Sequence, residues 1–170
     1  KAKSIQSEMA EGWVQRAIDV YEQAIAIARK AVGIIEKQDL AKLLCDTAGF
    51  KQDNKQFHLI GNQYEEALMI FKQLVEQNPE IYTPYVSNTL GSLANLHQCL
   101  GKYDLALHEY NEVLSICRNL AEKTPYAYLP EVAITFHNLA ILHNDLHEHN
   151  LAEHEYNESI AIYRILAKET

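Results

Sequence analysis

The sequence contains few residues that break helices and no motif that builds a catalytic site. Its 170 residues include only six glycines and four prolines, so long stretches are free to be helical. The glycines occur singly, which excludes a phosphate-cradling loop, and there is no HExxH zinc helix, nucleophile elbow or strand-borne pair of acids. We therefore expect no catalytic residues, no enzymatic activity and no cofactor.

Positive charge and long apolar runs are scarce as well. The formal net charge of -8 comes without a basic patch, which excludes nucleic acid and favours a neutral or basic partner. No apolar run approaches the roughly 20 residues that span a bilayer, and no signal peptide opens the chain. We expect no membrane partner and a soluble, cytoplasmic protein.

Cysteine is also rare, and its spacing builds neither a disulfide framework nor a CxxC metal site. Cys45, Cys99 and Cys117 are odd in number and widely spaced, which indicates reduced thiols. The sequence starts without methionine and ends inside a helical pattern, so we expect a fragment of a longer protein.

An internal repeat is the strongest pattern that is present. Residues 78–123 match residues 124–169 at an offset of 46, the spacing from Pro79 to Pro125, with nearly half of the positions identical. The same offset carried back is weaker, and a further echo starts at Tyr21. We predict one repeat domain over 1–170 with about three and a half repeats: a partial repeat at 1–37 and full repeats at 38–78, 79–124 and 125–170.

Each repeat has the pattern of two antiparallel helices. Apolar residues recur at helical spacing up to Leu100, Gly101-Lys102 interrupts them, and they resume from Tyr103. We expect the proline pair Pro79 and Pro84 to end one unit and start the next. The predicted helices are about 4–36, 39–53, 56–77, 84–100, 103–122, 130–146 and 149–168, with division of the first range into two helices as an alternative.

These units resemble the tetratricopeptide repeat family. The resemblance is carried by Leu93-Ala94, Gly101-Lys102-Tyr103, Ala106 and Tyr110. It implies an all-α fold, an α-α superhelix in which antiparallel helix pairs form a right-handed solenoid. The period of 46 exceeds the roughly 34 residues usual in the family, and such extended repeats are similar to those of kinesin light chain and of long bacterial arrays.

The resemblance also implies a binding module for a peptide or protein segment, held on the concave face that the first helices line. Amide side chains both donate to and accept from a peptide backbone, which makes asparagine and glutamine the best contacts. The candidate partner-binding residues are Asn88, Asn95, Gln98, His137, Asn138, Ile141, Asn144 and Asp145.

Five of the eight histidines lie between His137 and His154. His143 and His147 have the four-residue spacing that brings two imidazoles to one helical face, which makes them weak metal candidates. His143 also occupies the repeat position of His97, which favours a packing role, and no accompanying ligand shell is recognisable. We therefore expect no metal site.

Two other functions stay open beside peptide binding. The chain could act as a structural or self-assembling spacer, or as a regulatory repeat domain of a larger multidomain protein. The last predicted helix has apolar residues at the repeat positions that face a following unit: Ile160, Tyr163 and Leu166. We therefore expect the uncapped repeat ends to support a homo-oligomer.

Overall fold

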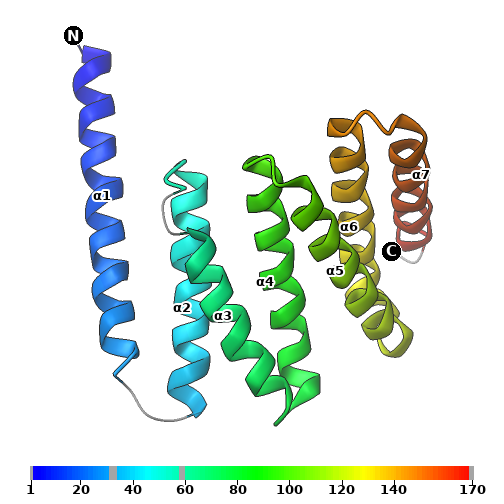
Figure 1. Ribbon diagram of the computed structural model, residues 1–170, viewed down its shortest axis with the longest axis horizontal. Helices are drawn as coiled ribbons and strands as arrows, with labels where there is room; N and C mark the ends of the chain where they lie inside the picture. Colours follow the sequence, from blue (N-terminus) through cyan, green and yellow to red (C-terminus); the bar gives the residue numbers. More distant parts are fainter. Residues whose placement is uncertain (1, 31–33, 58–59, 169–170) are drawn as a thin grey trace. The chain divides into compact units, whose positions relative to one another are not determined.

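The structure is a computed structural model that describes residues 2–30, 34–57 and 60–168, with only the backbone described for residues 2–9 and 34–36. Within these residues there are seven helices and no strands (Figure 1). The helices are α1 (Ala2–Ala28), α2 (Ile34–Asp53), α3 (Ile60–Val75), α4 (Pro79–Cys99), α5 (Tyr103–Lys123), α6 (Pro125–Asp145) and α7 (His149–Leu166). The predicted all-α class is confirmed.

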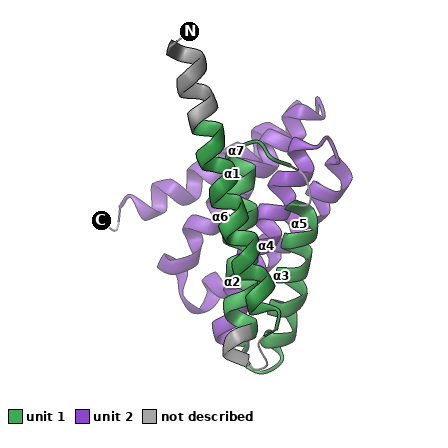
Figure 2. Cartoon of the chain, turned by 90° about the vertical axis from the view of Figure 1, so that its left-hand side faces the viewer, with its two compact units in different colours: residues 1–79 green, residues 80–170 purple. Residues whose placement is uncertain are grey.

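The helices fall into two compact units, residues 1–79 and residues 80–170 (Figure 2). In the first unit, α2 packs against both α1 and α3. In the second unit, α6 packs against both α5 and α7, while side-chain hydrogen bonds join α4 to α5. The hairpins α2–α3, α4–α5 and α6–α7 correspond to the predicted helix pairs.

The core of the second unit uses small residues on both helices of each hairpin. Ala94 of α4 and Ala106 of α5 are fully buried, and Ala140 and Ala152 are buried at the equivalent positions of α6 and α7. Small side chains let two helix backbones approach closely. Tyr110 is the largest fully buried side chain, so α5 presents an aromatic ring to its neighbours beside this close approach.

The helices α4 and α6 begin about one and a half turns earlier than predicted. Pro79 and Pro125 are the first helical residues, whereas Pro84 and Pro130 lie inside the helices instead of starting them. An interior proline costs about 3 kcal/mol because it lacks one N–H and crowds a carbonyl. In α4, burial of Tyr82 in the first turns opposes this cost, because helical backbone before Pro84 is what places Tyr82 in the core.

The prediction of a first helix over about 4–36 is wrong at its C-terminal end. Helix α1 ends at Ala28, where the backbone N–H of Lys30 bonds to the carbonyl of Ile27 in the tight turn that closes many helices. Helix α2 then begins at Ile34, and α3 begins at Ile60 rather than near residue 56. Residues 31–33 and 58–59 lie outside the described residues.

The three hairpins turn at one equivalent position in the left-handed backbone region. Lys55 has φ of 58°, Gly101 has φ of 71° and His147 has φ of 62°. The next backbone N–H bonds five residues back at 2.8 Å in every turn: Gln56 to Lys51, Lys102 to His97, and Glu148 to His143. This Schellman arrangement ends the first helix of each pair, and glycine fits it without a Cβ penalty.

The left-handed position predicts that His147→Gly stabilises the chain. We expect the free energy of unfolding to rise by about 0.5–1 kcal/mol, because glycine relieves the strained backbone at a modest entropic cost. Urea titration followed by circular dichroism measures the change. Gly101→Ala is the matched control and should destabilise, since alanine enters the same conformation; a loss of stability in His147→Gly would contradict the account of the turn.

Candidate functional site

A groove lies between α4 and α6 in the second unit, with α5 as its floor. Its cavity volume is about 230 Å³. The α4 wall consists of Ser87, Asn88, Gly91, Ser92 and Asn95; the floor of Tyr110 and Val113; and the α6 wall of Glu131, Ile134, Thr135 and Asn138. The walls are thus the first helices of two successive hairpins.

Three of the predicted contact residues line this groove. Asn88 and Asn95 lie on the α4 wall and Asn138 on the α6 wall. The groove therefore has amide side chains on both sides, with Asn88 and Asn95 exposed and Asn138 half-buried. The remaining predicted residues do not line it: Gln98, His137, Ile141, Asn144 and Asp145.

Tyr110 fixes the orientation of the amide of Asn95. The buried Tyr110 hydroxyl donates a hydrogen bond of 2.6 Å to Oδ1 of Asn95 and lies 3.1 Å from Oε1 of Gln98. Burial raises the pKa of Tyr110 well above its ordinary value, so the hydroxyl keeps its proton and remains a donor. Because Oδ1 accepts from Tyr110, the Nδ2 group of Asn95 is the one left to serve the groove as a donor.

Gln98 and Asp145 bind each other across the two wall helices. Nε2 of Gln98 in α4 donates to Oδ2 of Asp145 in α6 at 2.8 Å. Oε1 of Gln98 lies near the Tyr110 hydroxyl, whose one proton goes to Asn95. Gln98 and Asp145 therefore link α4 to α6 at the surface beside the groove.

Two further predicted contact residues have neighbours in the α6–α7 hairpin. The His137 ring lies edge-on to Tyr156, with 5.5 Å between ring centroids. Oδ1 of Asn144 lies 3.2 Å from Nδ1 of His149. His137, Asn144 and Ile141 remain exposed, so they extend the α6 surface beyond the groove.

Two hydroxyl groups of the groove walls make their contacts within the chain. The hydroxyl of Ser87 lies 3.1 Å from Sγ of Cys117, and the Thr135 hydroxyl donates to the carbonyl of Glu131 at 2.7 Å. Burial raises the pKa of the Cys117 thiol, and the nearby Glu131 charge adds to this effect, while the Ser87 contact opposes it. A protonated thiol is a poor nucleophile, so Cys117 contributes packing beside the groove rather than reactivity.

Sequence reasoning missed one charged residue of the groove. Glu131 lies on the α6 wall, one turn before Ile134 and Thr135. The predicted helix over 130–146 already placed Glu131 on the same helical face as Ile134 and Asn138. Glu131 was missed because the contact residues were sought mainly among amide side chains.

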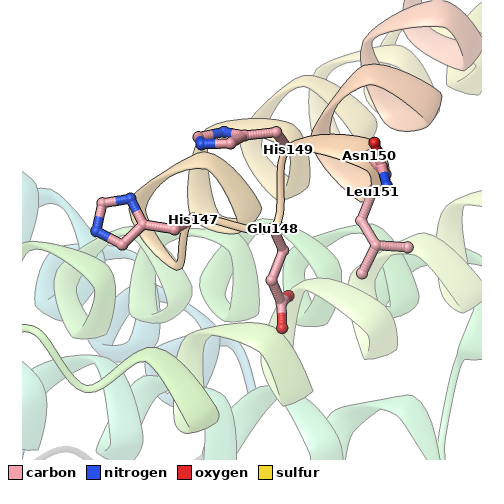
Figure 3. Close-up of a pocket in the computed structure, with 5 residues that line it drawn as sticks. All are labelled: His147, Glu148, His149, Asn150 and Leu151. Carbon is pink, nitrogen blue, oxygen red and sulfur yellow. The ribbon is translucent and has the colours of Figure 1, made fainter.

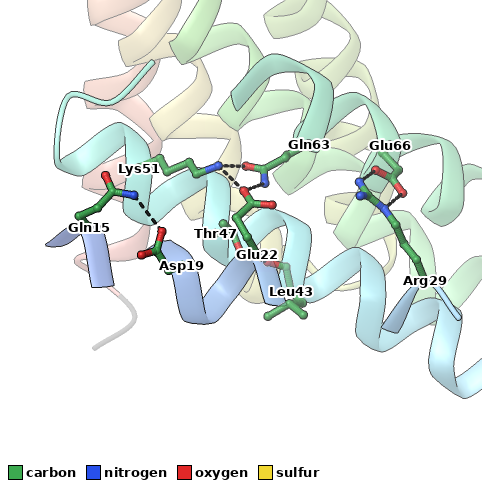
Figure 4. A network of polar contacts seen from close by, with 9 residues as sticks. All are labelled: Gln15, Asp19, Glu22, Arg29, Leu43, Thr47, Lys51, Gln63 and Glu66. Atoms are coloured by element: carbon green, nitrogen blue, oxygen red, sulfur yellow. Dashed lines mark hydrogen bonds and ion pairs between the residues drawn. The ribbon is translucent and has the colours of Figure 1, made fainter. Parts of the chain in front are cut away.

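A polar pair joins the helices of each hairpin at equivalent positions. Nδ1 of His97 lies 2.9 Å from a Glu109 carboxylate oxygen, and Nδ1 of His143 lies 2.7 Å from Oε2 of Glu155. The first unit has Lys51 and Gln63 at the same positions, and both bind the carboxylate of Glu22 in α1 (Figure 4). These contacts join the two helices of each hairpin close to its turn.

The helical spacing proposed for a metal pair is wrong. His143 lies in α6, but that helix ends at Asp145, and His147 occupies the left-handed turn, so the two imidazoles do not share a helical face. His147 lines a separate hollow of about 370 Å³ with Glu148, His149, Asn150 and Leu151, where Glu148 points away from both rings (Figure 3). Among the described residues, no group of three or more candidate ligands could hold a metal ion.

The His97–Glu109 pair predicts a pH-dependent effect of Glu109→Gln. Burial raises the pKa of the Glu109 carboxyl despite the opposing hydrogen bond from His97. The stability that this group contributes is present at low pH and lost as pH rises through the raised pKa. We expect Glu109→Gln to be more stable than the native chain at neutral pH, with the difference shrinking as pH falls.

Thermal unfolding across a pH series measures this difference. Glu153→Gln, which changes an exposed carboxylate of α7, is the matched control and should leave the pH profile unchanged. A Glu109→Gln variant that is less stable at neutral pH and approaches the native chain only in acid would show that pairing with His97 outweighs burial.

Comparison with known proteins identifies the repeat type. The tetratricopeptide repeat model matches residues 86–165, which make up most of the two hairpins that frame the groove. The crystal structure of BtubC (BKLC) from P. vanneervenii aligns over 91% of this chain with a TM-score of 0.67 and 23% identity. Residues 86–165 are tetratricopeptide-type repeats, and the chain has the fold of a tetratricopeptide-type repeat protein. It spans 58% of the length of BtubC.

Other tetratricopeptide-like structures align more loosely. MamA matches with a TM-score of 0.47 and 12% identity, over 95% of both chains. A kinesin light chain with nearly identical TPR-like repeats from Podosopora anserina matches with a TM-score of 0.42 and 18% identity, over 93% of this chain and 90% of that one. No curated protein has a matching sequence.

Repeats of this type share a general role. Tetratricopeptide repeats commonly mediate protein–protein interaction. Within the described residues, no helix is long and apolar enough to cross a membrane.

Proposed function

We propose that the groove between α4 and α6 binds an extended segment of another protein. The observation that carries this proposal is the presence of Asn88, Asn95 and Asn138 on opposite walls of one cavity. Amide groups bond to a peptide backbone with little demand on its side chains. The chain would then recruit a protein partner and would itself catalyse nothing.

The size of the groove supports a peptide over a small molecule. Its volume of about 230 Å³ falls below the roughly 300–1,000 Å³ of typical small-molecule pockets. A peptide that crosses the protein surface needs cavity volume only for the atoms that enter the groove. The floor of Tyr110 and Val113 supplies apolar contact beneath such a segment.

The fixed amide of Asn95 also supports the proposal. Tyr110 is fully buried and holds Oδ1 of Asn95, so the donor group of Asn95 is positioned before a partner arrives. A pre-oriented donor loses less conformational freedom on binding, which raises affinity. Tyr110 thereby acts as a positioning residue beneath the groove.

Self-association is a second candidate function. Ile160 and Tyr163 of α7 are each 45% exposed, whereas Leu166, the third residue named for this end, is half-buried. Exposed apolar side chains on one helix can dock against another copy. Self-association stays a prediction. So do a spacer or regulatory role and a cytoplasmic location.

The peptide proposal predicts that Asn95→Ala combined with Asn138→Ala weakens binding. The probe is a fluorescent peptide selected by the native chain from a phage-displayed library of random 12-residue peptides. Loss of two hydrogen bonds should reduce its affinity by about ten-fold or more, because each contributes roughly 0.5–1.5 kcal/mol. Fluorescence anisotropy measures the affinity, and circular dichroism checks that helicity is unchanged.

The matched control is Asn119→Ala combined with Asn157→Ala. Both asparagines are exposed, on α5 and α7, and neither lines the groove. The control should bind the probe as the native chain does. Equal affinity of the native chain and the Asn95/Asn138 variant would move the binding site away from the groove.

A further inference from the structure

The two wall helices of the groove carry no lysine and no arginine. Helix α4 has one acidic residue, Glu80, and helix α6 has two, Glu131 and Asp145. Asp145 is engaged by Gln98. Glu131 is therefore the one formally charged side chain that lines the groove among the described residues.

The charge of Glu131 is not neutralised by the surrounding elements. Within the described part of the chain, no lysine or arginine forms an ion pair with its carboxylate. Arg118 of α5 contacts α6 through Phe136, with its guanidinium carbon 5.1 Å from the centroid of that ring. A cation brought by a ligand would complement this exposed carboxylate.

The α4 wall offers a place for a backbone to approach. A Cβ added at Gly91 would meet nothing within 4 Å, so internal packing does not require glycine there. The absent side chain leaves the helix surface open to a ligand backbone. Asn95 lies one turn further along the same wall, with its Nδ2 donor left for a passing carbonyl.

The carboxylate of Glu131 and the amide of Asn95 lie at different ends of the groove. Because α4 and α6 are equivalent helices of successive repeats, Glu131 falls at the same end as Ser87 and Asn88. Asn95 and Asn138 fall one to two turns further along. A segment that lies along the groove would meet a carboxylate at one end and amide groups at the other.

We propose that the occupant of the groove is a basic segment in an extended conformation. A lysine or arginine of the segment pairs with Glu131, while its backbone passes over Gly91 and accepts a hydrogen bond from Asn95. Glu131 is then the residue that sets specificity, because the amides bind any backbone and the carboxylate selects positive charge. This inference rests on the proposed peptide-binding function and names the chemistry of its partner.

Selection from the random 12-residue phage library tests the preference directly. We expect peptides retained by the native chain to be enriched in lysine and arginine. The same selection on Glu131→Lys should lose that enrichment and favour aspartate and glutamate. Glu153→Lys, which makes the same charge change at an exposed site on α7 outside the groove, is the matched control and should keep the native preference.

Affinity measurements with one selected lysine-containing peptide sharpen the test. Glu131→Gln should weaken binding by about two- to five-fold, as expected for an exposed ion pair, and should reduce its salt dependence. Replacing that lysine of the peptide with norleucine should weaken its binding to the native chain by the same factor. The same replacement should leave binding to the Glu131→Gln variant unchanged. Gly91→Leu should weaken binding of every selected peptide while circular dichroism stays helical.

The outcomes separate this inference from the proposed function. If the Asn95/Asn138 variant loses all peptides but selection shows no preference for positive charge, the groove binds peptides and the basic partner is wrong. If Glu131→Lys keeps the native preference, Glu131 is not the selecting residue and the inference is overturned. If the native chain retains no peptide, or the groove variants lose none, both proposals fail.

Discussion

The close pairing of two helices within each hairpin is the constraint on which the groove depends. Buried alanines at Ala94, Ala106, Ala140 and Ala152 allow this approach, and the His97–Glu109 and His143–Glu155 pairs join the two helices of each hairpin close to its turn. With α5 held against α4 in this way, Tyr110 reaches the back of the first helix and contacts Asn95. The orientation of a surface amide thus follows from core packing.

The electrostatics of the groove follow from which helices carry the charged residues. In the second unit the lysines and arginines lie on α5 and α7 and on neighbouring turns, and none lies on α4 or α6. The groove walls are therefore polar, with Glu131 as their formal charge. A net charge of -8 over the whole chain adds a general attraction for a basic partner.

The repeat made much of this arrangement predictable. Spacing alone placed the helix pairs, and the equivalence of first helices brought Asn88, Asn95 and Asn138 to one face, where the structure joins them in one groove. Proline chemistry misled the prediction of the helix starts, because burial of Tyr82 in the turn before Pro84 opposes the local cost of the ring. Glu131 was missed for another reason: the contact residues were sought mainly among amide side chains.

Other features depend on contacts that no local pattern encodes. The bond between Gln98 and Asp145 joins residues far apart in sequence, and only the packing of α4 beside α6 brings them together. The left-handed turn at His147 was hidden for a different reason: its repeat equivalent is Gly101, whereas histidine does not indicate such a backbone by itself. Because His147 lies in this turn and not in α6, the helical spacing suggested for His143 and His147 as metal ligands is wrong.

Photo-crosslinking tests most directly whether the groove holds the partner. A benzoylphenylalanine placed at Asn88, on the groove rim, should crosslink to a peptide selected by the native chain, whereas the same group at Asn119 of α5 should not. Mass spectrometry of the crosslinked product identifies the attachment site. Crosslinking from Asn119 without crosslinking from Asn88 would contradict the account and would place the partner on another face.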